Sequence, residues 1–461
     1  MKLNKLMLGA AAMALGSGVF AQNVTFHSGI DYTVWGLRRA FYNNDGEKDN
    51  TSASAGYDPD GNMTVDVSVK AASFEFNLGL YFNADGGDEE YFDFSDSDAG
   101  KGTPFYQGNM KVGFFNDQVN LYTGKFEGFN GGFIAEGSVL GDQYITNIAD
   151  QDYGPYLTGL EFTPQFLSGL RLFAGFPILP IRGNGIQTDD GFEYNQWKYL
   201  GKKIKLAASY QVPVDGLDLT VNAGFRPGTY YDGVDKSTMQ TATETFTKSM
   251  FGEGYIQAVM PNLADMVNLV VSYDLRYRDG EFLNIKNETE EHKAFSHMVG
   301  LSASMGLTEE LSLACEDRLV YCGDDYIADS EKLLYNVLAV NGEYAVPGTQ
   351  ISLGMDLAQI CAADANGKAF ADDDGTGKIN TAAYASSSDI SLTLNDMATA
   401  TLLGGDATKY LGTYVKPYFK YNFSNGSLIA AFELAYSKAF TDDVSNTCLS
   451  YRIPVGIKFQ F

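Results

Sequence analysis

The alternation of apolar and polar side chains over segments of about ten residues constrains the fold more than any other feature. The last segment, residues 449–461, carries apolar side chains at odd-numbered positions and polar residues, glycine or proline at even-numbered ones. A period of two indicates a β-strand, because successive side chains point to opposite faces of a sheet. One such run is also typical of a half-buried strand in a soluble protein, so the prediction depends on repetition.

The alternation recurs along the chain, as in residues 74–82, 217–225 and 267–277, and the polar positions are often charged. Counting such segments between turn signals predicts about eighteen strands. They are residues 24–42, 63–70, 74–83, 105–115, 118–126, 154–163, 169–178, 199–211, 216–226, 248–260, 266–278, 294–307, 311–321, 333–345, 349–360, 412–423, 427–440 and 447–461. Residues 361–411 could hold a further hairpin or a short loop helix, so sixteen and twenty strands are the alternatives.

Very short connections alternate with long, acidic ones. The short ones carry turn-forming residues, namely Asn116-Asp117, Asp215-Gly216, Thr308-Glu309-Glu310, Pro347-Gly348 and Asn425-Gly426. Among the long ones, residues 84–104 contain seven acidic residues and a single lysine. Outer-membrane barrels show this asymmetry, with short periplasmic turns and longer extracellular loops.

Residues 1–21 predict a cleaved export signal. Lys2 and Lys5 precede a short apolar run, and Val19-Phe20-Ala21 is a small-residue cleavage site. The mature chain, residues 22–461, is expected to form one domain. It has no uninterrupted apolar stretch of the roughly 18 residues that a spanning helix needs. The formal net charge of −26 argues against nucleic acid as a partner.

The export signal, the alternating last strand and the terminal Phe461 together resemble bacterial outer-membrane β-barrel proteins, and the pattern of turns and loops is most similar to the general porins. The resemblance covers essentially the whole mature chain. It implies an all-β fold, a single transmembrane antiparallel β-barrel in the bacterial outer membrane. It also implies that Phe459 and Phe461 form the signal read by the barrel assembly machinery, and it makes a homotrimer embedded in outer-membrane lipid a candidate assembly.

The expected function is a porin, a passive diffusion channel for small hydrophilic solutes or ions. Barrels of sixteen to eighteen strands are wide enough to leave an aqueous channel. Extending the alternation inward predicts a charged pore lining that includes Lys70, Glu75, Lys111, Arg171, Lys203, Lys205, Asp274, Arg276, Arg278, Arg318, Lys416, Lys420, Glu433, Arg452 and Lys458.

The sign of ion selectivity has two opposing contributions. Acidic loops around the outer mouth favour cations at low salt, whereas the basic residues of the last three strands could reverse the preference. Lys416, Lys420, Arg452 and Lys458, with Glu433 between them, could form a basic ladder that sets up a transverse field, or an ordinary set of paired lumen charges. By position and length, residues 127–153 resemble the porin loop that folds into the channel.

Two other functions compete with the porin. One is a surface adhesin or antigen, whose long loops bind a partner while the barrel serves as a platform. The other is a substrate-specific channel for a hydrophobic compound or an oligosaccharide.

Aromatic residues near strand ends, such as Tyr277, are expected to form interfacial girdles.

We expect no enzymatic activity, cofactor or metal site. His297 falls on the predicted lipid face, while Ser302 has the opposite parity, so a serine–histidine pair is not indicated. The acidic loops lack the spacing of a calcium-binding loop. For the cysteines, a bridge between Cys322 and Cys361 and free thiols are both open.

Overall fold

Strands make up nearly all of the described chain. The computed structural model describes residues 23–44, 47–49, 55–56, 60–83, 105–125, 156–177, 186–188, 191–193, 205–226, 234–235, 240–241, 250–264, 266–283, 289–322, 333–363, 409–440 and 445–460. In these ranges no helix is long and apolar enough to cross a membrane. The expected signal peptide, the expected constriction loop at 127–153, most of 361–411, and Phe461 lie outside the described residues.

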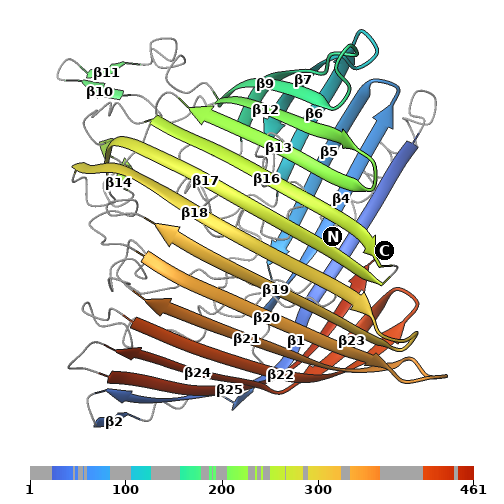
Figure 1. Cartoon of the computed structure of the whole chain (residues 1–461), viewed down its shortest axis with the longest axis vertical. Coiled ribbons are helices and arrows are strands. Elements are labelled where there is room, and N and C mark those ends of the chain that lie inside the picture. Colours follow the sequence, from blue (N-terminus) through green and yellow to red (C-terminus); the bar gives the residue numbers. More distant parts are fainter. Residues whose placement is uncertain are drawn as a thin grey trace, which may run out of the picture.

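The strands follow one another along the chain, and the long ones lie side by side in the wall of a barrel (Figure 1). They are β1 (Asn23–Asn44), β2 (Glu47–Asp49), β3 (Ala55–Gly56), β4 (Asp60–Ala71), β5 (Phe74–Asn83), β6 (Phe105–Phe114), β7 (Val119–Lys125), β8 (Tyr156–Phe162), β9 (Leu170–Pro177), β10 (Ile186–Thr188), β11 (Gly191–Glu193), β12 (Lys205–Val214), β13 (Leu217–Arg226), β14 (Val234–Asp235), β15 (Gln240–Thr241), β16 (Met250–Leu263), β17 (Val267–Leu283), β18 (Thr289–Gly306), β19 (Leu311–Cys322), β20 (Leu333–Ala345), β21 (Ile351–Ala363), β22 (Lys409–Phe423), β23 (Gly426–Ala431), β24 (Glu433–Phe440) and β25 (Ser445–Gln460).

The long strands form one antiparallel sheet in which each pairs with the next long strand along the chain. β23 and β24 are two parts of a single strand interrupted at Phe432, so the wall of the barrel contains 18 strands. β2 and β3 are short additions to β1, while β10–β11 and β14–β15 are separate small hairpins. The expected fold class and strand number are confirmed.

The first and last strands pair with each other and close the sheet. β1 pairs with β4 from Asn23↔Lys70 to Thr33↔Asp60 and with β25 from Gly29↔Gln460 to Asn43↔Thr447. Since β1 has a partner on both sides, no long edge is left with unpaired N–H and C=O groups. This closure explains why β25 keeps the alternation of a wall strand along its length.

The short turns gather at one end of the barrel, which we call the turn end. All five turns expected from the sequence lie between paired strands, and their backbone fits their residues. Asn116 and Asp117 have φ of 57° and 60°, a left-handed conformation that Asn and Asp tolerate best among residues with a Cβ, and Gly216 has φ of 75°. β1 begins at this end and β25 finishes there, because Asn23 pairs beside the β4–β5 turn and Phe459 pairs with Gly426.

Candidate functional site

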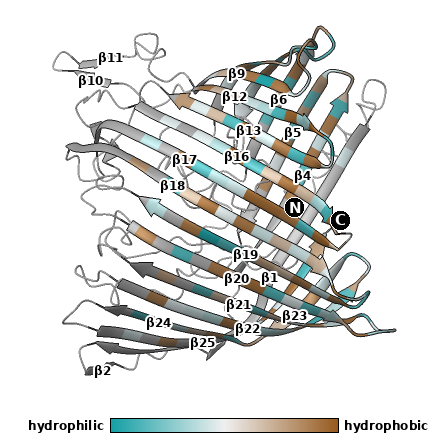
Figure 2. Ribbon diagram, in the orientation of Figure 1, coloured by the Kyte–Doolittle hydropathy of each residue, from teal (hydrophilic) through white to brown (hydrophobic). Residues whose placement is uncertain are grey.

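Polar side chains line the inner face of the barrel, and apolar side chains cover the outer face. Arg318 and Asn341 are 0% exposed, whereas Leu160, Val299 and Leu353 are 54%, 48% and 49% exposed. Figure 2 shows hydrophobic and hydrophilic residues alternating along the strands. Sequence alternation alone cannot tell inside from outside, and the structure places the charged face inside, as expected.

The outer face also carries a few polar groups. Asp317 accepts a hydrogen bond from Asn336 Nδ2 at 2.7 Å, between outward-facing positions of β19 and β20. His297 Nδ1 lies 2.9 Å from the Tyr273 hydroxyl, and its neighbour Phe295 is 48% exposed. The structure therefore places His297 on the outer face, as expected, and buries Ser302 on the inner one.

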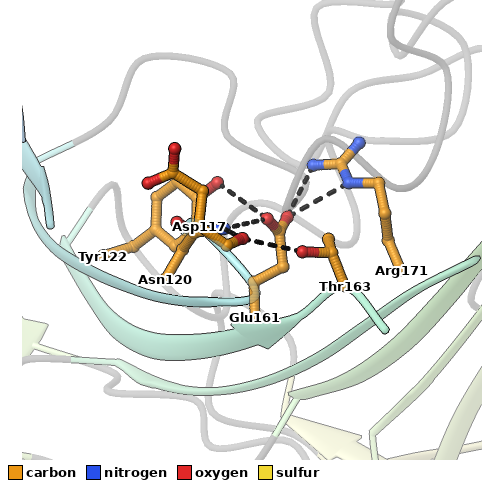
Figure 3. A network of polar contacts seen from close by, with 6 residues as sticks. All are labelled: Asp117, Asn120, Tyr122, Glu161, Thr163 and Arg171. Carbon is orange, nitrogen blue, oxygen red and sulfur yellow. Dashed lines mark hydrogen bonds and ion pairs between the residues drawn. The ribbon is translucent and has the colours of Figure 1, made fainter. Parts of the chain in front are cut away.

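A first inner cluster surrounds Glu161 near the turn end (Figure 3). Arg171 on β9 donates to Glu161 Oε2 from Nη2 at 2.7 Å and from Nε at 3.1 Å. The other oxygen, Oε1, accepts from Asn120 Nδ2 at 2.8 Å and from the Tyr122 hydroxyl at 3.3 Å. The side chain of Glu161 is 4% exposed, so these four bonds replace the water that the carboxylate loses on burial.

The Glu161 cluster is anchored to the turns at both sides. Asn120 Nδ2 and Thr163 Oγ1 both donate to the backbone carbonyl of Asp117, at 3.1 and 2.8 Å. The ammonium group of Lys111 lies 5.5 Å from the ring centroid of Tyr122, within cation–π range. Arg171 is thereby held in place as a guanidinium whose charge is already matched by a carboxylate.

A cavity of about 570 Å³ adjoins this cluster at the turn end. It is lined by Thr163, Pro164, Gln165, Ser168, Gly169, Leu170, Arg171, Ser209, Gln211, Thr220 and Asn222. Most of these side chains carry hydroxyl or carboxamide groups. Its volume falls within the range of small-molecule sites.

A second inner cluster extends across β20, β21 and β22. The Tyr418 hydroxyl donates to Glu343 Oε2 at 2.8 Å, and Asn341 Nδ2 donates to Tyr418 at 3.3 Å and to Asp356 Oδ1. Asp356 is 1% exposed. The cluster therefore holds the buried carboxylate of Asp356 and the partly buried one of Glu343 by side-chain hydrogen bonds across three neighbouring strands.

The basic ladder expected on the last strands is interleaved with acids. Lys416 Nζ lies 3.5 Å from Glu433 Oε1, and Lys420 Nζ lies 4.0 Å from Glu343 Oε2. Arg452 pairs in register with Glu433, although only its backbone is described. The geometry favours paired lumen charges over an unopposed basic wall.

Lys458 pairs in register with Asp31 on β1 and with Ser427 on β23. The other expected lining residues fall into three groups. Lys70 lies 3.9 Å from Glu75, which pairs in register with Lys111. Arg318 forms an ion pair with Glu316, two positions earlier on β19, and Asp274 is 2% exposed. Only the backbone is described for Lys205, Arg276 and Arg278, and Lys203 lies outside the described residues. Their role as a pore lining stays a prediction.

Sequence reasoning missed several of the partners that hold these charges. Asn120, Asn341 and Glu343 were not among the expected lining residues, yet they make the hydrogen bonds that join the strands. The parity of their strands was the available signal, because each lies on the same face as a predicted charge. The choice of partner across strands could not be made from parity alone.

The part of the chain that the structure describes contains free cysteines and shows no cluster of metal-binding residues. Cys315 and Cys361 are free thiols, so the Cys322–Cys361 bridge is not formed. The described residues contain no group of three or more His, Cys, Asp or Glu placed to hold a metal ion.

Comparison with solved structures finds outer-membrane channels. The chain is similar to the anion-selective porin from Comamonas acidovorans, with 10% identity, a TM-score of 0.44 and coverage of 95% of this chain and 99% of that one. It is also similar to OprD of Pseudomonas aeruginosa, with 12% identity, a TM-score of 0.43 and coverage of 96% of both chains. The outer membrane channel DcaP of Acinetobacter baumannii gives 10% identity, a TM-score of 0.39 and coverage of 96% and 99%. No protein-family model and no curated protein matches the chain.

The barrel fold rests on the strand pairing and its closure. A closed wall of 18 antiparallel strands, polar inside and apolar outside, is the architecture of porin-type barrels. The porin-like barrel expected from the sequence is confirmed at the level of the fold.

Proposed function

We propose that the protein is a bacterial outer-membrane channel through which small hydrophilic solutes diffuse. The observation that carries the proposal is the sidedness of the closed barrel. Inner positions hold charged residues such as Glu161 and Asp274, which are 3% and 2% exposed. Exposed apolar side chains such as Leu353 cover the outer face. A protein folding in water would bury the apolar face instead, because burial of apolar surface drives folding there.

The wall of the barrel supports a conducting interior. Barrels of this strand number are wide enough for an aqueous channel. Several charges described on the inner face are matched, as in Arg171 with Glu161 and Lys416 with Glu433. A matched lining favours weak ion selectivity and passage of solutes by size, without a catalytic step.

The remaining partners are proposals of the same kind. Lipid of the outer membrane would contact the exposed apolar side chains, and the assembly machinery would read the last strand with Phe459. A homotrimer stays a prediction, as does the export of the mature chain by residues 1–21.

Reconstitution in planar lipid bilayers tests the channel. We expect discrete conductance steps from folded protein and none from protein unfolded by heat before addition. A reversal potential measured across a salt gradient then gives the sign and size of ion selectivity. A barrel that inserts fully, as judged by protease protection, but carries no current would contradict the proposal.

A further inference from the structure

One stretch of the inner wall carries a run of uncharged polar side chains. Ser209, Gln211, Thr220, Asn222, Gln257 and Ser272, on β12, β13, β16 and β17, form what we call the uncharged wall. Their register places them in two parallel rows, one from Ser209 to Asn222 and one from Gln211 through Thr220 and Gln257 to Ser272.

One charge lies on the wall's own strands, because exposed Asp218 is two positions from Thr220 on the same face of β13. Two further charges stand at the sides of the wall. Arg171 pairs in register with Ser209, and Asp274 follows beyond Tyr255 on β17. Four strand spacings of about 4.8 Å put these two backbones roughly 19 Å apart along the wall. A small zwitterion therefore cannot bridge Arg171 and Asp274, and Arg171 is already engaged by Glu161.

Three side chains of this wall have buried polar atoms without a hydrogen-bond partner among the described residues. They are Asn222 Oδ1, Gln257 Nε2 and Ser272 Oγ, in side chains that are 6%, 7% and 3% exposed. Leaving such groups unpaired costs about 1–3 kcal/mol each, so a partner from the lumen is favoured. Their terminal torsions are broad or free, which allows each group to turn toward a solute.

The uncharged wall continues into the cavity of about 570 Å³ at the turn end. Ser209, Gln211, Thr220 and Asn222 belong to both, and Thr220 pairs in register with Gln257. The unpartnered atoms comprise an acceptor, a donor and a hydroxyl. A solute hydroxyl can donate or accept, so a polyol or sugar can satisfy all three atoms without bringing a charge to the wall.

We propose that the uncharged wall and its cavity form a binding subsite for a neutral polyhydroxylated solute, such as a small sugar, at the turn end of the barrel. The subsite deepens the proposed channel function and rests on it, because the solute reaches the wall through the lumen. Aromatic stacking contributes little, since the inward rings of Phe173 and Tyr255 are each 3% exposed. Recognition therefore relies on hydrogen bonds, and affinity is expected to be weak.

Sucrose, with lysine and glutamate as charged comparisons, is the probe. In bilayers the wild-type current should fall saturably with sucrose and much less with either amino acid at the same concentration. Asn222→Leu and Gln257→Leu should each raise the half-blocking sucrose concentration about fivefold, the equivalent of one net hydrogen bond. Ser272→Ala is the mildest of the three changes and should raise it in the same direction.

Asn77→Leu is the matched control, because it removes a carboxamide from the inner face of β5, where Asn77 bonds Asn109 at 3.1 Å. It should leave the sucrose block unchanged. Equal block in all variants, or block by an amino acid and not by sucrose, would overturn the subsite while leaving the channel intact.

Equilibrium dialysis of labelled sucrose against detergent-solubilised protein separates the two proposals. Saturable binding that Asn222→Leu weakens supports the subsite even if no current is seen, in which case the channel function fails alone. Absence of binding together with normal conductance overturns the subsite alone.

Discussion

The ring of Tyr418 lies against the backbone of Gly354, its cross-strand partner on β21. A Cβ at Gly354 would meet the ring and the hydroxyl group of Tyr418 directly. The missing side chain lets the ring lie flat along the inner wall, where its hydroxyl reaches Glu343 and Asn341. A glycine in a strand interior weakens the strand, and here close approach of the ring explains its presence.

Gly354→Ala should therefore destabilise the barrel by about 1–3 kcal/mol, the usual cost of overpacking. The urea midpoint of unfolding in detergent, followed by far-ultraviolet circular dichroism, measures the change. Gly254→Ala is the control, because a Cβ at that strand position meets nothing within 4 Å. Equal midpoints for the two variants would show that the Tyr418 ring shifts without cost.

The Glu161 cluster makes a second prediction. Glu161→Gln keeps an oxygen for Asn120 and Tyr122 but removes the charge that balances Arg171. We expect the channel to gain anion preference and to lose about 1–3 kcal/mol of stability. The loss should lie at the lower end, because Arg171 is 34% exposed and water screens its charge.

Reversal potential and urea midpoint together check the Glu161 prediction. Thr163→Val is a suitable comparison, because it removes a hydrogen bond to Asp117 of the same cluster without changing any charge. A shift of selectivity in Thr163→Val as large as in Glu161→Gln would mean that the charge of Arg171 is not what the permeating ion senses.

The ion pair of Lys416 and Glu433 allows a test in which removing either partner should shift ion selectivity in opposite directions. Lys416→Met leaves a carboxylate facing the lumen and should favour cations, whereas Glu433→Gln should favour anions. A unit charge about 4 Å from a permeating ion contributes about 1 kcal/mol in water, so permeability ratios should change by roughly two- to fivefold.

The double variant Lys416→Met with Glu433→Gln should return the reversal potential close to the wild-type value. Glu309→Gln, an exposed turn position, controls for loss of a carboxylate away from the inner wall. If both single variants shifted selectivity in the same direction, structural damage and not charge would be the cause.

The sequence carries much of the fold because alternation and turn residues are local signals. Residues 74–83 and 333–345 are strands with the predicted bounds, and Asp215-Gly216 is a turn because glycine supplies the positive φ. Parity along each strand is then enough to assign Glu75 and Lys416 to the polar face.

The hydrogen-bond partners could not be predicted in the same way. Asn341 meets Asp356 because the β20–β21 register aligns them, and Tyr418 joins them through Gly354 on a neighbouring strand. Asn341 is 15 residues from Asp356 and 77 residues from Tyr418 along the chain. The register that brings them together depends on the geometry of the turns between the strands, which the pattern of a single strand does not encode. The uncharged wall was missed because Ser, Thr and Asn at polar positions look like ordinary strand residues.

The last prediction tests whether the outer face of the barrel contacts the hydrocarbon of the membrane. Val299 is 48% exposed on β18, and its cross-strand partner Leu319 on β19 is 46% exposed. Val299→Arg would place a charge in the apolar belt and should destabilise the inserted barrel by about 2–4 kcal/mol if the position is near the bilayer midplane. The yield of folded protein in liposomes, read from heat-modifiable electrophoretic mobility, should fall accordingly.

Val299→Leu, which keeps the surface apolar, should insert like the wild type. If Val299→Arg inserted equally well, or were soluble and folded without detergent, this face of β18 would not contact lipid. The nearby hydrogen-bonded pair of Asp317 and Asn336 would then indicate that the face contacts protein.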